Sequence, residues 1–166
     1  MSARPAVVAF VAHSGTGKTT LIEQLITLAT TAGLRVGAVK HDAHRFDIDH
    51  PGKDSHRFTA AGAEATLLAA DDKLALVRRH QACPPVDELI GQFCGDLDLV
   101  LVEGWKTSNL PRIEVHRPEL GRPFLDHDPN LVAVAADGPI TVDVPVLDLN
   151  DPAAILTFIR ERFDLP

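Results

Sequence analysis

Apolar and polar residues follow one another along the chain in blocks that predict alternating strands and helices. Continuous apolar runs at 7–11 and 99–102 are typical of strands buried on both faces of a parallel sheet. Between them, apolar residues recur at helical spacing from Leu21 to Ala29, and Gly33 follows as a stop signal. The same reasoning predicts strands at 36–40, 65–70, 74–77, 98–103, 131–135 and 144–147, and helices at 86–93 and from Pro152 onward. This order predicts an α/β, P-loop NTPase-like three-layer fold with a mostly parallel sheet flanked by helices.

Three further segments have weaker patterns. Residues 112–117 alternate polar with apolar, which indicates an edge or half-buried strand with Arg112 and Arg117 in solvent. The pair of strands at 65–70 and 74–77 is close enough to form a hairpin. Proline and glycine at 117–129 predict a surface loop, and residues 41–55 read as a second irregular stretch.

Between the first strand and the first helix lies a loop of small residues that ends in lysine and threonine. Glycines there let backbone N–H groups turn inward around a phosphate, Lys18 can reach the β- and γ-phosphates, and Thr19 offers a hydroxyl to Mg²⁺. The pattern departs from G-x-x-x-x-G-K-[ST] at its first position, where Ala12 requires a negative φ. The candidate nucleotide-binding residues are Ser14, Gly15, Thr16, Gly17, Lys18, Thr19 and Thr20.

A carboxylate for the magnesium ion is expected at the end of a neighbouring strand. Glu103 closes the run at 99–103, and ligands of open α/β sheets bind at the carboxyl ends of the strands. Asp98, five residues earlier, would lie roughly 16 Å away at the opposite edge. We therefore assign Glu103 to the magnesium site and Asp98 to a turn, with a metal-free loop acid as the alternative for Glu103.

The segment 41–56 holds four histidines and four aspartates, a density that suggests chemistry. A switch-like loop is favoured, in which Asp42, Asp47 and Asp49 hold Mg²⁺ or its water and Arg45 or Lys53 binds an anion. Asp49 is thus a candidate metal ligand beside Thr19, and Asp42 joins Glu103 as a candidate catalytic residue. The histidines lack a recognised zinc spacing, so a transition-metal site and a merely solvated loop remain alternatives.

Composition limits the partners. The chain of 166 residues is long enough for one domain, 1–166, with a substantial core. Its formal charge of -7 argues against nucleic acid or an anionic membrane as a partner. We predict a cytoplasmic protein, because neither a signal peptide nor an apolar run of membrane-spanning length occurs in the sequence.

Base preference does not follow from the residues themselves. A guanine-reading N-K-x-D motif is absent from the sequence, and Asp137 stands where a base-reading acid could sit, although a turn aspartate before Gly138 is equally ordinary. Trp105 would either stack on a ligand or cap the core.

Four segments together resemble the molybdopterin-guanine dinucleotide biosynthesis protein B family: 14–21, Lys40-His41, 47–55 and 101–104 with Lys106. The resemblance implies a GTP-binding protein, usually a homodimer, that works beside the guanylyltransferase joining GMP to molybdopterin. Molybdopterin itself is a further candidate ligand. The resemblance implies a partner- or substrate-facing surface comprising Lys40, His41, Asp47, Pro51, Gly52, Lys53, Asp54 and Ser55.

Three functional hypotheses follow. The first is an adapter that binds Mg²⁺ and GTP and has weak GTPase activity, with Arg45 and Arg57 as the candidate stabilising cations. The second is an ATP-dependent small-metabolite kinase that uses the same loop. The third is a nucleotide-stabilised interaction module without turnover.

Overall fold

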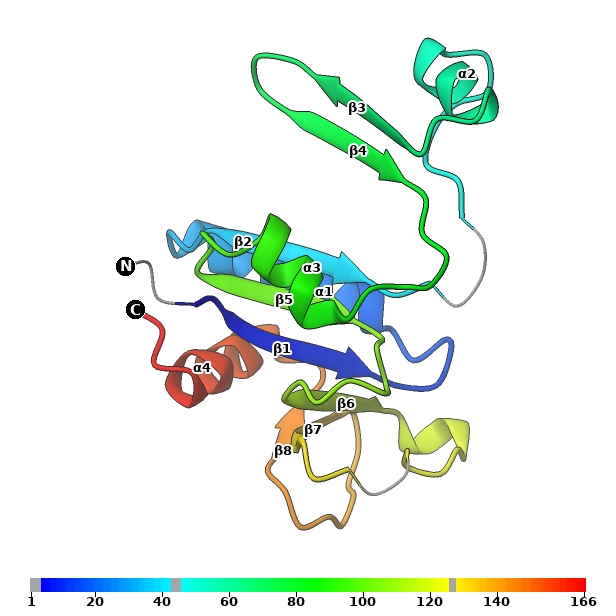
Figure 1. The fold of residues 1–166 in the computed structure, drawn as a ribbon. Helices are drawn as coiled ribbons and strands as arrows, with labels where there is room; N and C mark the ends of the chain where they lie inside the picture. Colours follow the sequence, from blue (N-terminus) through cyan, green and yellow to red (C-terminus); the bar gives the residue numbers. More distant parts are fainter. Residues whose placement is uncertain (1–3, 43–45, 126–127) are drawn as a thin grey trace. The chain divides into compact units, whose positions relative to one another are not determined.

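The computed structural model describes residues 4–42, 46–125 and 128–166 (Figure 1). The elements in chain order are β1 (Ala6–Val11), α1 (Lys18–Thr31), β2 (Val36–Lys40), α2 (Asp54–Ala60), β3 (Ala65–Ala69), β4 (Leu74–Arg78), α3 (Val86–Phe93), β5 (Leu99–Glu103), β6 (Arg112–His116), the 3₁₀ turn η1 (Pro118–Leu120), β7 (Leu131–Ala136), β8 (Val146–Asp148) and α4 (Pro152–Arg162). Contacts divide the chain into two compact units, 1–41 with 85–166 and, separately, 42–84.

The larger unit contains a six-stranded sheet in the order β2-β5-β1-β6-β7-β8. Every neighbouring pair in it is parallel. Strand β1 lies between β5 and β6, with Phe10 paired to Glu103 and Val11 to Glu114. The residues that follow β1 and β5 therefore emerge side by side at one edge of the sheet, where α/β proteins bind their ligands.

Helices cover both faces of this sheet. Apolar residues of α1 and α4 pack with Phe10, Leu101 and Ile113 in the larger core cluster. On the other face, Val86 and Ile90 of α3 pack with strand residues in a smaller cluster. Figure 1 shows the resulting three layers, with α3 on the opposite side of the sheet from α1 and α4. The predicted fold class is confirmed.

The smaller unit consists of helix α2 and the antiparallel pair β3-β4. Leu67 pairs with Leu76 and Ala69 with Leu74, so the predicted hairpin is confirmed. Helix α2 was not anticipated, because its seven residues carry a single large apolar side chain, Phe58, and therefore show no helical apolar period.

The prediction of a half-buried or edge strand at 112–117 is wrong. Strand β6 lies between β1 and β7, and all five of its residues are buried. Arg112 and Arg117, expected in solvent, are instead ion-paired with Asp128 and Asp137 respectively. An alternating pattern indicates a solvent-exposed face only when no other part of the chain covers that face. Here, loops of the same unit cover the polar face of β6.

Among the residues that the structure describes, no helix combines the length and the apolarity needed to cross a membrane.

Candidate functional site

The glycine-rich loop follows β1 and leads directly into α1. Gly15 and Gly17 have φ angles of 80° and 91°, a left-handed conformation that side chains other than glycine rarely adopt. The carbonyl oxygen of His13 accepts hydrogen bonds from Thr16 Oγ1 at 3.0 Å and from Lys18 Nζ at 3.2 Å. Ala12 is not among the residues with positive φ, so it satisfies the requirement for a negative φ at the first position of the loop pattern.

The end of β5 brings a carboxylate to the start of α1. Thr19 Oγ1 donates a hydrogen bond to Glu103 Oε2 at 3.1 Å, and Lys40 Nζ lies 3.5 Å from Glu103 Oε1. A hydroxyl beside a carboxylate at the first turn of a helix is an all-oxygen donor pair of the kind Mg²⁺ prefers. Thr19 and Glu103, predicted from separate parts of the sequence, are therefore brought together and fit this ion.

Asp98 lies at the opposite end of the same strand, as predicted. Its carbonyl accepts from the N–H of Ala6 at the beginning of β1, and its carboxylate accepts from the N–H of Arg35 at 2.7 Å. The hydrogen bond from the Arg35 N–H and a second one from the Arg35 guanidinium to the same carboxylate lower the pKa of Asp98. The role of Asp98 is to join the amino ends of neighbouring strands.

Lys18 is partly withdrawn from water in this loop. Burial lowers its pKa, the negative charge of Glu103 opposes that effect, and the positive charges of Lys106 and Lys40 add to it. Three lysines and one glutamate thus share a small region around the loop. This excess of positive charge favours binding of an anion there.

Strand β2 delivers Lys40 and His41 beside the turn that follows β5. Gly104 has a φ of 88°, and a Cβ at that position would stand 3.5 Å from the His41 carbonyl oxygen. The rings of His41 and Trp105 lie with their centroids 4.8 Å apart. Trp105 also packs against the smaller apolar cluster, which supports its core-capping role.

A segment far along the chain contacts the glycine-rich loop, and the sequence analysis missed it. The Arg117 guanidinium donates through Nε to the Thr16 carbonyl at 2.9 Å and through Nη1 to Asp137. Arg122 Nη1 donates to the Ser14 carbonyl at 2.6 Å. Asp137, considered as a base reader, therefore binds Arg117 in this structure. Nothing in the alternating pattern at 112–117 distinguishes Arg117 from a solvated arginine, and Arg122 lies in the predicted surface loop.

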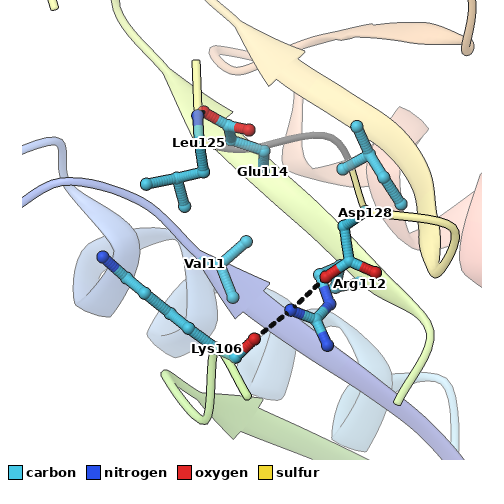
Figure 2. Close-up of a pocket in the computed structure, with 7 residues that line it drawn as sticks. Val11, Lys106, Arg112, Glu114, Leu125 and Asp128 are labelled. Carbon is cyan, nitrogen blue, oxygen red and sulfur yellow. Dashed lines mark hydrogen bonds and ion pairs between the residues drawn. The ribbon is translucent and has the colours of Figure 1, made fainter. Parts of the chain in front are cut away.

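Strand β6 contributes a row of buried polar residues on one face, and a cavity of about 200 Å³ lies against it. Figure 2 shows Arg112 bonded to Asp128 and to the Lys106 carbonyl, with Glu114 beside Leu125. The N–H of Leu125 donates to Glu114 Oε1 at 3.0 Å. Burial nevertheless raises the pKa of Glu114, because withdrawal from water outweighs that hydrogen bond.

The remaining predicted residues lie in the smaller unit. Asp49 Oδ1 accepts from Ser55 Oγ at 3.0 Å and from the His50 N–H at 2.9 Å, while its Oδ2 is buried without a partner among the described residues. Asp47 Oδ1 accepts from the N–H of Asp49. Asp49 thus organises its own segment, and its role as a ligand of the same magnesium ion as Glu103 stays a prediction.

Other predicted positions of this unit are solvent-exposed. Arg57 pairs with Asp54 at 3.4 Å on α2. Arg45 and His44 lie outside the described residues. Within the described ranges, no three His, Cys, Asp or Glu side chains gather as a metal site would require. The exposed residues among the predictions for this unit are Asp42, Asp47, Pro51, Gly52, Lys53, Asp54 and Arg57.

Comparison with known proteins shows which family the chain resembles. The family described as "Molybdopterin guanine dinucleotide synthesis protein B" matches residues 7–137. The molybdopterin-guanine dinucleotide biosynthesis adapter protein of Escherichia coli (strain K12) is 40% identical over 163 residues, which cover 93% of this chain and 91% of that protein. Its counterpart in Haemophilus influenzae is 39% identical, covering 89% of this chain and 84% of that protein.

Solved structures agree with the sequence relatives. The crystal structure of a MobB protein homolog from Bacillus stearothermophilus superposes with a TM-score of 0.72 at 28% identity, covering 97% of this chain and 99% of that one. The family match spans the glycine-rich loop, Glu103 and Asp137, and the identities to the relatives extend over nearly the whole chain. The chain therefore belongs to the molybdopterin guanine dinucleotide synthesis protein B family.

Proposed function

We propose that this protein is an adapter in molybdopterin-guanine dinucleotide biosynthesis that binds GTP with Mg²⁺ and hydrolyses it slowly. In this role it assists the guanylyltransferase that attaches GMP to molybdopterin. Membership in the family supports the biosynthetic role, because the similar proteins of Escherichia coli and Haemophilus influenzae are named as adapters of this synthesis. Binding of the nucleotide, of the metal and of the transferase is proposed in addition to that role.

One observation carries the nucleotide part: the Thr19 hydroxyl and the Glu103 carboxylate meet 3.1 Å apart beside a left-handed glycine turn and Lys18. In such a loop, backbone N–H groups hold the phosphates and the lysine adds a mobile charge. Thr19 and Glu103 would hold Mg²⁺ directly or through water. The ion would neutralise charge on the β- and γ-phosphates.

Slow hydrolysis is supported by the hydrogen bonds of Arg117, which lies beside the glycine-rich loop. A fast GTPase presents a cation to the charge that develops on the γ-phosphate. The Arg117 guanidinium already donates to Asp137 and to the Thr16 carbonyl. It is therefore committed to the protein rather than free to follow the reacting phosphate, and turnover depends on Lys18 and the metal.

The preference for guanine rests on the family alone. The names of the relatives describe the biosynthesis of a molybdopterin-guanine dinucleotide. A protein that assists GMP transfer would gain from binding the same nucleotide as the transferase. Asp137 follows β7 at the ligand edge of the sheet, but its carboxylate accepts from Arg117, so we assign it no base contact.

The partner part of the proposal concerns the segment that leaves β2. Lys40 lies beside Glu103, and His41 lies beside Trp105. A nucleotide bound at Glu103 would therefore affect the conformation of this part of the chain. The exposed residues Pro51, Gly52, Lys53 and Asp54 continue the same segment. We propose that the transferase, with or without molybdopterin, contacts this segment, and that the chain works as a homodimer.

The test is calorimetric titration of the purified protein with GTP and with ATP, each with Mg²⁺, for the wild type and the Lys18→Ala variant. We expect GTP to bind more tightly than ATP and Lys18→Ala to weaken GTP binding by about tenfold to a hundredfold, since it removes a charged phosphate contact. Arg162→Ala, at an exposed cation near the end of α4, is the control and should leave the affinity unchanged.

Other results would change the proposal. Unchanged affinity in Lys18→Ala would show that the nucleotide site is elsewhere. Preference for ATP would favour a small-metabolite kinase, whose ATP consumption depends on an acceptor. Binding of GTP without phosphate release above the Lys18→Ala background would indicate an interaction module without turnover.

A further inference from the structure

We propose that Arg117 and Arg122 are positioning residues that hold the glycine-rich loop open for phosphate before any nucleotide arrives. The proposal rests on the proposed function, because it concerns the same site. Neither arginine needs to touch the nucleotide. Each acts through a loop carbonyl.

The contacts come from one short segment, residues 117–123, which lies about a hundred positions away from the loop in sequence. Arg117 Nε donates to the carbonyl of Thr16 at 2.9 Å, and Arg122 Nη1 donates to the carbonyl of Ser14 at 2.6 Å. His13 Nε2 lies 3.0 Å from the carbonyl oxygen of Pro123. The segment thus meets the loop at three of its residues.

Through the geometry of the peptide bond, these contacts also orient the N–H groups that would donate hydrogen bonds to phosphate. In a planar trans peptide, the C=O of one residue and the N–H of the next point in opposite directions. Fixing the Thr16 carbonyl toward Arg117 therefore directs the N–H of Gly17 away from Arg117. Fixing the Ser14 carbonyl toward Arg122 does the same for the N–H of Gly15.

These two N–H groups are available for a ligand. Among the described residues, no hydrogen bond uses the N–H of Gly15 or of Gly17. Both glycines have positive φ, so their N–H groups belong to a turn of the kind that binds anions. The arginines satisfy the carbonyls on one side of the loop and leave the donors on the other side for phosphate.

Arg117 is itself held in place. Its side chain is about 29% exposed, and its Nη1 donates to Asp137, whose side chain is 14% exposed. A Cβ at Gly17 would stand 3.4 Å from Arg117 Nη2, which shows how closely the guanidinium approaches the loop. The guanidinium bonds the carbonyl through Nε and the carboxylate through Nη1, two nitrogens held in a fixed planar fork. A lysine has all of its donors on one nitrogen and would not reproduce this geometry.

The energetic reason for such an arrangement is the flexibility of glycine. A loop with two glycines loses more backbone freedom on ordering than other sequences do. If the loop were ordered only by the nucleotide, that loss would reduce the affinity. Because the arginine hydrogen bonds form in the free protein, the loss of backbone entropy occurs on folding. More of the free energy of the phosphate interaction then contributes to the affinity for the nucleotide.

The first experiment measures backbone ¹⁵N order parameters in the nucleotide-free protein for the wild type, Arg117→Gln and Arg122→Gln. We expect wild-type values near the rigid level of about 0.85 at Gly15 and Gly17. Arg117→Gln should lower the value mainly at Gly17, and Arg122→Gln mainly at Gly15, because each arginine bonds a different carbonyl. Arg162→Gln is the matched control for the loss of an arginine charge. Unchanged values at both glycines would overturn the proposal.

The second experiment compares the affinities of the same variants for Mg-GTP and Mg-GDP. Arg117→Gln should weaken both by a similar factor of about ten to a hundred, since a bond from a charged group is lost and the β-phosphate cradle is common to both ligands. Arg117→Lys should recover less than half of that loss on a logarithmic scale. The exposed Arg122 should give a smaller effect in the same direction.

The two proposals fail in different ways. A loss confined to GTP would show that Arg117 contacts the γ-phosphate, which overturns the positioning role and leaves nucleotide binding intact. A wild-type protein that binds neither nucleotide would overturn the proposed function, and the ligand part of this inference with it. In that case the order parameters still decide whether the arginines hold the loop.

Discussion

At the scale of single residues, the most unusual feature is the polar face of β6. Arg112, Glu114 and His116 alternate along a strand that is buried on both sides. Arg112 is neutralised by Asp128. Glu114 accepts a hydrogen bond from the N–H of Leu125, and its Oε1 lies 4.0 Å from Nδ1 of His116. The His116 ring stacks on Phe124, and burial lowers its pKa. The row therefore contains a carboxyl group whose pKa is raised by burial.

This arrangement gives a pH dependence with a definite sign. Because the folded-state pKa of Glu114 lies above the ordinary value of 4.5, the folded protein binds its proton more tightly than the unfolded chain does. The group therefore costs stability as pH rises from about 4.5 through the raised pKa. Nearby His13 and Lys106 oppose this shift without cancelling it.

We predict that Glu114→Gln is more stable than the wild type at pH 8, and that this advantage shrinks steadily toward pH 4. Glutamine keeps an oxygen to accept from Leu125 and removes the charge. The measurement is denaturant unfolding at several pH values, with Glu161→Gln, an exposed change on α4, as the control. A stability difference that does not vary with pH would contradict the assignment.

Other residue-level features were readable in the sequence because their cause is local. Glycine at 15 and 17 is required by positive φ, and the sequence predicts that the last helix begins at Pro152. Helix α4 does begin there, and the Asp151 side chain caps it by accepting from the N–H of Ala154 at 3.0 Å. Arg117 and Arg122 were missed because their partners, Thr16 and Ser14, are about a hundred residues distant.

At the scale of elements, the candidate site depends on four of them meeting at one edge. Strands β1 and β5 are parallel neighbours in register, so the loop after β1 and the acid at the end of β5 come together. Helix α1 then places Thr19 in its first turn, within hydrogen-bond distance of Glu103. Lys40 at the end of β2 completes the edge. Sequence reasoning could place Glu103 at this edge because strand direction alone determines it.

We predict that Glu103→Gln reduces the contribution of Mg²⁺ to GTP affinity at least about tenfold, because an ionised oxygen ligand is replaced by a neutral one. Affinity measured without Mg²⁺ should change less. Titration of GTP at several Mg²⁺ concentrations separates the two effects. Glu161→Gln should behave as the wild type, and an Mg²⁺ dependence that survives Glu103→Gln would place the ion elsewhere.

At the scale of the whole molecule, the exposed apolar residues are unevenly distributed. Of the eleven large apolar side chains exposed among the described residues, six lie in the smaller unit: Phe46, Ile48, Phe58, Leu67, Leu68 and Leu74. Leu67 and Leu74 lie on one face of the β3-β4 pair. We predict that this face of the hairpin contacts a protein partner, because exposed apolar side chains that gather on one face are typical of such surfaces. A second copy of the chain is the partner that we expect from the resemblance.

We predict that the wild type has twice the chain mass of 17.9 kDa in solution and that the double variant Leu67→Lys with Leu74→Lys is a monomer. Charges placed on this face would be buried without partners in a dimer. Light scattering after size exclusion measures the mass. Leu28→Lys, on α1 in the larger unit, is the control. A dimeric double variant would assign the patch to another partner.

The sequence by itself determined the features that arise from local chemistry or from strand direction. These are the parallel α/β architecture, the hairpin at β3-β4, the glycine-rich loop with its left-handed turns, and the placement of Glu103 at the ligand edge. Apolar runs, glycine conformation and the polarity of a strand need no knowledge of distant residues. For this reason they could be derived from the order of amino acids.

Only the tertiary structure decided which charged residues are buried. The alternation in β6 has the same appearance whether its polar face meets water or a covering loop, and the position of that loop depends on the whole unit. Ion pairs such as Arg112–Asp128 and Arg117–Asp137 stabilise charges that sequence reasoning leaves in solvent. The partners in each pair are separated by a loop, and the folded path of that loop, which sequence spacing does not reveal, brings them together.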